Sequence, residues 1–108
     1  MGKIRVLVTG EEALVREALV SLLKTYDDID TIGEAADGKE TIDRVHDLQP
    51  DVVLMDITMK DMNGLEVTRH LTRQAAETKV VILIDRETMD SVAGTFLAGA
   101  QGCIPKAA

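Results

Sequence analysis

Five short aliphatic runs recur at near-regular intervals along the chain, separated by segments with apolar residues at helical spacing. The runs are continuously apolar rather than alternating, which is typical of strands covered on both faces. They lie at residues 4–8, 31–35, 52–55, 80–84 and 102–104. The helical stripes comprise Leu14, Leu19, Leu22, Leu23 and Tyr26; Ile42, Val45 and Leu48; Leu65, Val67 and Leu71; and Val92, Phe96 and Ala100. Because crossovers between parallel strands are right-handed, this alternation predicts an α/β fold with a doubly wound, five-stranded parallel sheet.

Local signals support these boundaries. Asp37 is followed three residues later by Glu40, which is typical of a helix start at which acids accept unpaired backbone N–H groups. Pro50 is expected to end the second helix before the third strand. Gly64 follows Asn63 at a break before the third helix, and Gly99 is a plausible stop for the fourth.

Composition narrows the class of protein. A chain of 108 residues is enough for one domain, and a net charge of −7 makes nucleic acid a poor direct partner. Cys103 is the single cysteine, so neither an internal disulfide nor a cysteine-built zinc site is expected. The longest apolar run is far shorter than the roughly 20 residues of a membrane span. We therefore expect a cytoplasmic protein that makes no contact with a membrane.

Acidic and basic residues stand where the predicted strands end. Glu11 and Glu12 follow the first strand, Asp56 ends the third, and Lys106 follows the fifth. In a doubly wound sheet these carboxyl ends converge, and ligands bind there. Such a cluster could hold a divalent cation through oxygen ligands while an aspartate accepts a phosphoryl group.

Each of these residues also has a purely structural interpretation. Asp56 could cap the following loop, and Glu11 and Glu12 are acids of the kind that a helix N-terminus favours. Lys106 taken alone would be a solvated surface charge. The combination is more informative than any member.

Several segments resemble those of response-regulator receiver domains, in particular receivers joined to LuxR-type helix-turn-helix output domains, the NarL/FixJ group. The resemblance covers essentially the whole chain. The segments are residues 4–8 (IRVLV), 13–17 (ALVRE), 33–38 (GEAADG), 50–56 (PDVVLMD), 62–66 (MNGLE), 79–83 (KVVIL) and 99–102 (GAQG). The resemblance implies a flavodoxin-like sheet in strand order 2-1-3-4-5, and the edge position of the fifth strand suits Pro105, which lacks a backbone donor.

The resemblance also implies roles for individual residues. Asp56 would be the phosphoacceptor and Lys106 would contact the phosphoryl group. Mg²⁺ would be held by Glu11, by Asp56 and by the backbone carbonyl of Thr58, with Glu12 as a further candidate. The implied partner is a sensor histidine kinase. The chain would be a signalling module rather than an enzyme, apart from its own phosphorylation and dephosphorylation.

Three of the departures from the family pattern concern the cation site and the switch. Gly10 stands where the family has the first of two consecutive acids, Ile84 where it has a hydroxyl residue, and Cys103 where it has an aromatic. Loss of a carboxylate weakens a Mg²⁺ site, and a butyl side chain offers the phosphoryl group no hydrogen bond. Two hypotheses follow: a receiver that takes phosphate at Asp56 with weakened or altered switching, and a phosphorylation-independent module for dimerisation or partner docking.

A nucleotide- or flavin-binding enzyme with a flavodoxin-like fold is a further alternative. Gly94 and Gly99 resemble half of a phosphate-binding loop, but Ala100 and Gln101 follow where a lysine and a hydroxyl residue are needed. No glycine-rich dinucleotide motif follows the first strand, which also disfavours this alternative.

The family's fifth helix would follow Lys106, whereas this sequence ends at Ala108. We therefore treat residues 1–108 as one receiver domain that stops before the fifth helix and lacks an output domain. Without that helix, aliphatic surface near Leu14, Val15 and Leu19 would be bare. We therefore expect either self-association or that the sequence is a fragment of a longer regulator. Any contact with DNA would come through the output domain.

Overall fold

The computed structural model describes residues 2–56, 64–75, 77–84 and 102–105, with the backbone alone at Leu65, Ile84 and 103–105. Five parallel strands form one sheet in the order β2-β1-β3-β4-β5. The strands are β1 (Ile4–Thr9), β2 (Ile29–Ala35), β3 (Val52–Asp56), β4 (Lys79–Ile84) and β5 (Gly102–Pro105). The helices are α1 (Ala13–Leu23), α2 (Gly38–Leu48) and α3 (Gly64–Gln74). The expected strand order and the edge position of Pro105 are confirmed.

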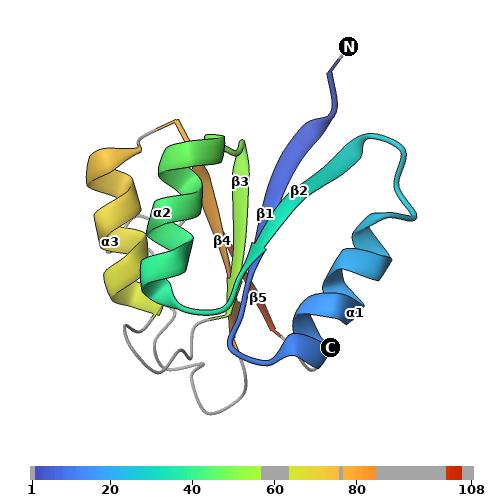
Figure 1. Ribbon diagram of the computed structural model, residues 1–108, viewed down its shortest axis with the longest axis horizontal. Coiled ribbons are helices and arrows are strands. Elements are labelled where there is room, and N and C mark those ends of the chain that lie inside the picture. Colours follow the sequence, from blue (N-terminus) through green and yellow to red (C-terminus); the bar gives the residue numbers. More distant parts are fainter. Residues whose placement is uncertain (1, 57–63, 76, 85–101, 106–108) are drawn as a thin grey trace.

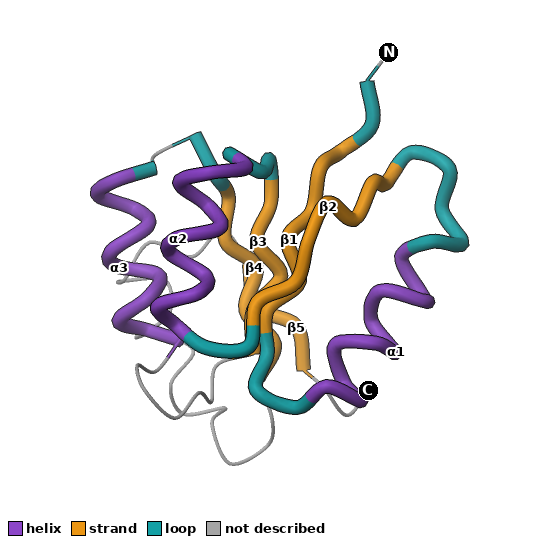
Figure 2. The backbone as a smooth tube through the Cα atoms, in the orientation of Figure 1, coloured by secondary structure: helices purple, strands orange, loops and turns teal. Residues whose placement is uncertain are grey.

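The helices cover the two faces of the sheet unequally. Figure 1 shows α2 and α3 side by side on one face and α1 on the other, and the tube in Figure 2 shows the same layers. The buried core lies on the side of α2 and α3, because continuous apolar strands meet the apolar stripes of these helices there. Its members are Leu7, Val45, Val53, Met55, Val67, Leu71, Val80 and Ile82.

The strands extend slightly beyond the predicted runs. β2 begins at Ile29, two residues before the predicted start, because Ile29 pairs with Ile4 despite the acidic residues around it. The β1–β2 register shifts between Val6 and Leu7: Val6 pairs with Thr31, whereas Leu7 pairs with Gly33. One extra residue of β2 is thus accommodated, as in a β-bulge.

The predicted ends of α2 are confirmed. The Asp37 side chain accepts a hydrogen bond from the backbone N–H of Glu40 at 2.7 Å, so it caps the helix. The helix ends at Leu48, and Gln49 adopts a left-handed conformation with φ of 48° immediately before Pro50. α3 begins at Gly64, as the predicted break indicates, whereas the stripe of Val92, Phe96 and Ala100 lies outside the described residues.

The apolar stripe of α1 is less buried than its spacing predicts. No residue of this helix is fully buried, and Leu14 is 80% exposed and Leu22 55% exposed. Val15 and Leu19 are half-buried, because the helix packs mainly on β1 and β2. The bare surface expected near Leu14 is therefore present, and self-association through it stays a prediction.

Candidate functional site at the carboxyl ends of the strands

Asp56 is the last residue of β3 and lies beside the end of β1. Thr9 of β1 pairs with Met55 of β3, so the next residues along, Gly10 and Asp56, are neighbours. A Cβ atom placed on Gly10 would lie 3.6 Å from the Asp56 Cβ atom. Asp56 is only 9% exposed, in a strand whose other neighbour is β4. The structure thus brings a nearly buried carboxylate to the sheet edge that the sequence predicts.

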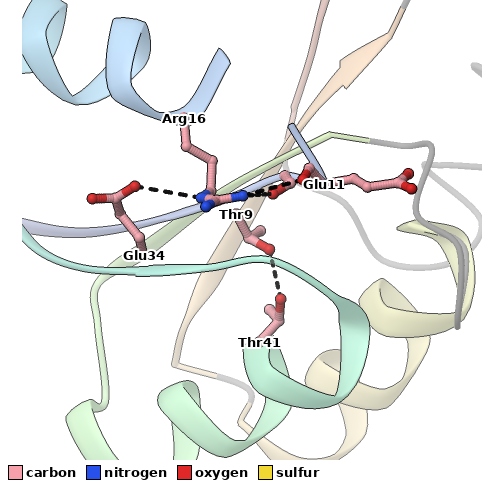
Figure 3. Close-up of polar contacts among 6 residues, drawn as sticks. Thr9, Glu11, Arg16, Glu34 and Thr41 are labelled. Carbon is pink, nitrogen blue, oxygen red and sulfur yellow. Dashed lines mark hydrogen bonds and ion pairs between the residues drawn. The ribbon is translucent and has the colours of Figure 1, made fainter. Parts of the chain in front are cut away.

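The loop between β1 and α1 is fixed by backbone contacts on both sides of Gly10. The Gly10 N–H donates to the Ala35 carbonyl at 3.0 Å. The Arg16 guanidinium donates through one nitrogen to the carbonyls of Gly10, at 2.6 Å, and Glu11, at 3.3 Å. Figure 3 shows Arg16 between this loop and Glu34 of β2. Arg16 therefore links α1, β2 and the loop beside Asp56.

The ion pair between Arg16 and Glu34 holds the other side of the guanidinium. Arg16 Nε lies 3.4 Å from Glu34 Oε1, and the two side chains are 17% and 44% exposed. Nε is buried and has no well-directed hydrogen bond, so the contact is chiefly electrostatic.

Sequence analysis did not identify Arg16 as a residue of this site. The available signal was its place one turn into α1, from which a side chain points back toward the helix start.

Glu11 and Glu12 differ in how they relate to this site. Glu11 is half-buried, and Figure 3 shows its side chain extending away from Arg16 and Glu34. Glu12 is exposed, and it precedes α1 in an extended conformation without capping the helix through its side chain. Glu11 is thus the less exposed of the two, and its carbonyl is held by Arg16.

A buried hydroxyl pair lies beneath the site. Thr9 Oγ1 and Thr41 Oγ1 are 2.6 Å apart, and both residues are fully buried (Figure 3). Thr41 also donates to the Asp37 carbonyl at 2.7 Å, which uses its only hydroxyl hydrogen. Thr9 is consequently the donor within the pair, and the contact ties the end of β1 to the start of α2.

The remaining predicted site residues cannot be placed with Asp56. Thr58 and Lys106 lie outside the described residues, and for Ile84 and Cys103 the description is limited to the backbone. Ile84 pairs with Pro105, and Cys103 pairs with Ile82, so both stand in the strands where the sequence places them. Gly94, Gly99, Ala100 and Gln101 also lie outside the described residues.

The donors at this edge suit a hard divalent cation. Asp56 and Glu11 offer carboxylate oxygens, which Mg²⁺ prefers, while Gly10 offers no side chain. Across residues 2–56, 64–75, 77–84 and 102–105, no group of three or more His, Cys, Asp or Glu side chains is arranged to hold a metal. The two carboxylates are chemically suited to Mg²⁺, but among the described residues they are the only two side-chain ligands that we assign to the site.

A cavity between described residues lies elsewhere and does not coincide with these carboxylates. It has a volume of about 340 Å³ and lies where α2 and α3 end, at the opposite end of the sheet. His46, Asp51 and Glu77 are among its lining residues. We place the candidate site at Asp56 on the basis of strand topology and carboxylate chemistry rather than cavity size.

Comparisons with known proteins point to one family. The sequence matches the response regulator receiver domain family over residues 6–108. It is 38% identical over 97 residues to the transcriptional regulatory protein LiaR of Bacillus subtilis, covering 90% of this chain and 46% of LiaR. It is 41% identical over 80 residues to the response regulator protein VraR of Staphylococcus epidermidis, covering 74% of this chain and 38% of VraR. The chain thus spans less than half the length of these relatives.

The fold is also similar to solved receiver structures. The signal receiver domain of the response regulator NarL from Mycobacterium tuberculosis superimposes with a TM-score of 0.91 at 28% identity. That match covers 100% of this chain and 87% of the NarL chain.

Within the part of the chain that the structure describes, none of the helices is long and apolar enough to cross a membrane.

Proposed function

The chain belongs to the response regulator receiver domain family, and we propose that it accepts a phosphoryl group on the Asp56 carboxylate. The observation that carries this proposal is the position of Asp56: nearly buried, at the carboxyl end of β3, directly beside Gly10. Because the chain belongs to this family, we prefer this function to the alternative of a nucleotide- or flavin-binding enzyme.

The proposed transfer needs one nucleophile and one leaving group. An Asp56 carboxylate oxygen attacks the phosphorus atom of the donor and forms a new P–O bond. The bond between phosphorus and the donor's leaving group breaks, and the leaving group keeps the electron pair. The low exposure of Asp56 limits the access of water to the acyl phosphate that results.

Receiver domains generally bind Mg²⁺ at the phosphorylation site, and Asp56 and Glu11 would hold it here. A bound divalent cation supplies positive charge that offsets the charge on the phosphoryl oxygens. Gly10 contributes no side-chain ligand, so we propose a weakened cation site. The resemblance adds the Thr58 carbonyl as a ligand, Glu12 as a further candidate and Lys106 as the phosphoryl contact.

The partners follow from the family and its relatives. We propose that a sensor histidine kinase supplies the phosphoryl group. LiaR is named a transcriptional regulatory protein, and this chain matches 46% of it. We accordingly propose that contact with DNA requires a helix-turn-helix output domain, and that the region described here is a signalling module.

A receiver that docks partners or dimerises without phosphorylation is the second candidate function. Gly10 favours it, because the carboxylate that would complete the cation site beside Asp56 is missing. Under this alternative, the Asp56 carboxylate would have a structural role only.

Phosphoryl uptake by the intact chain separates the two candidates. We would incubate the chain with Mg²⁺ and acetyl phosphate and measure the intact mass. The expected result is the addition of one phosphoryl group, abolished in Asp56→Asn. Asp51→Asn, at the opposite end of β3, is the matched control and should retain uptake. An unmodified wild-type chain would favour the docking module, and uptake that persists in Asp56→Asn would exclude Asp56 as the acceptor.

A further inference from the structure

We infer that Arg16, held by Glu34, is a positioning residue that orients the loop carrying Glu11 for divalent cation binding at Asp56. This inference rests on the proposed function, because it concerns the cation site used in phosphoryl transfer. It assigns a role to an ion pair that the sequence does not single out.

The contacts of Arg16 converge on the loop rather than on solvent. Its Nη1 atom donates to the carbonyls of Gly10 at 2.6 Å and Glu11 at 3.3 Å. The first of these is a short, charge-assisted hydrogen bond, the stronger kind. Because both acceptors belong to the two residues that follow β1, the guanidinium fixes the peptide from which the Glu11 side chain projects.

Gly10 makes this support necessary. Glycine has more backbone freedom than any other residue, and here it immediately precedes Glu11, the first of the two acids that follow β1. The Ala35 carbonyl holds the N–H side of Gly10, and Arg16 holds its carbonyl side. With both sides of Gly10 held, the backbone of Glu11 starts from a defined point, one residue after the glycine that lies beside Asp56.

Glu34 completes the arrangement from a different strand. It lies on β2, and its Oε1 atom is 3.4 Å from Arg16 Nε. The Arg16 side chain is mostly buried, at 17% exposure, and the neighbouring negative charge of Glu34 offsets part of the cost of removing the guanidinium from water. Residues that orient metal ligands without touching the metal typically change its affinity by about 10- to 100-fold when replaced.

Binding of Mn²⁺ tests the inference directly. Free Mn²⁺ would be measured by electron paramagnetic resonance with the wild-type chain, Arg16→Ala, Arg16→Lys and Glu34→Gln. We expect the dissociation constant to rise about tenfold in Arg16→Ala and by less in the other two variants. Arg44→Ala, on the exposed surface of α2, is the matched control and should bind as the wild type does.

A second readout separates positioning from a merely structural role. The initial rate of phosphoryl uptake would be measured against Mg²⁺ concentration for the same variants. We expect the half-saturating Mg²⁺ concentration to rise in Arg16→Ala while the rate at saturating Mg²⁺ stays unchanged. A rate reduced at every concentration, with unchanged half-saturation, would overturn the inference.

The outcomes distinguish this inference from the proposed function. If the wild type neither binds Mn²⁺ nor takes up phosphate, the proposed function falls and the inference falls with it. If the wild type does both and Arg16→Ala binds Mn²⁺ equally well, the inference alone falls. If Arg16→Ala does not fold, Glu34→Gln decides, because its half-exposed carboxylate can be neutralised without a buried defect. Weaker Mn²⁺ binding by that variant supports the inference, and unchanged binding overturns it.

Discussion

Two arginines donate to backbone carbonyls at opposite ends of the same sheet, and their surroundings differ. At the amino ends of the strands, Arg5 donates to the carbonyls of Gln49 at 2.8 Å and Leu48 at 2.7 Å, where α2 ends. At the carboxyl ends, Arg16 donates to the carbonyls of Gly10 and Glu11. Both meet backbone carbonyls at points where regular secondary structure ends.

The acids near the two arginines account for the difference in role. Near Arg5, the Asp51 side chain accepts the Arg5 backbone N–H at 2.9 Å, and the Asp51 carbonyl accepts from the Lys79 backbone N–H at 2.9 Å. These contacts connect β1 and β4 through the residue that precedes β3, so their role is structural. Near Arg16, Asp56 stands beside a glycine that leaves space for a further group. The contacts at the amino ends of the strands thus stabilise the fold, and we propose that the carboxyl ends carry the cation-binding and phosphoryl-accepting site.

Replacing Arg5 should have the largest effect on stability. Arg5→Ala removes two charged hydrogen bonds to the end of α2, so we expect the free energy of unfolding to fall by about 2 kcal/mol. Urea denaturation would measure it, with Arg69→Ala on the exposed surface of α3 as the control. Mn²⁺ affinity should not change. A loss of affinity in Arg5→Ala would remove the proposed division between the two ends.

Adding an acid beside Asp56 should strengthen cation binding. In Gly10→Asp the new Cβ would lie 3.6 Å from the Asp56 Cβ and 3.7 Å from the Arg16 Cγ, which are ordinary contacts. We expect Mn²⁺ affinity to rise about tenfold, equivalent to roughly 1.4 kcal/mol. Gly10→Asn is the matched control, because its side chain has the same shape but no charge. Equal affinities in the two variants would contradict a site limited by its carboxylates.

Replacing Thr9 should have the smallest effect of the three. Thr9→Val removes the donor from the buried pair and leaves a Thr41 oxygen without that partner, which should cost about 1 kcal/mol of unfolding free energy. Thermal or urea unfolding would measure it, against Thr25→Val on the exposed surface as the control. Because the carboxylates are untouched, cation affinity should stay at the wild-type value. If Thr9→Val lowered both the unfolding free energy and the cation affinity, the hydroxyl pair and the cation site would be coupled.

The fold was more predictable from the sequence than the site. Continuous apolar runs located all five strands because a parallel sheet buries both faces, and the resemblance supplied their order. Asp56 was predictable because it directly follows such a run. The apolar stripe of α1 predicted that Leu14 is buried, whereas it is exposed. Helical periodicity identifies the apolar face of a helix but does not show whether another element covers that face. Arg16 was missed because its contacts join residues of three elements, which no spacing rule connects. Thr58 and Lys106 remain predictions.

The extra residue in β2 determines which side chain Arg16 meets. If the ladder ran on regularly from the pair of Val6 and Thr31, Glu34 would stand opposite Thr9 instead of Val8. Neighbouring positions along a strand project to opposite faces, so such a shift would turn a side chain away from its present surroundings. An irregularity in one strand thereby sets the electrostatic surroundings of a loop that follows another.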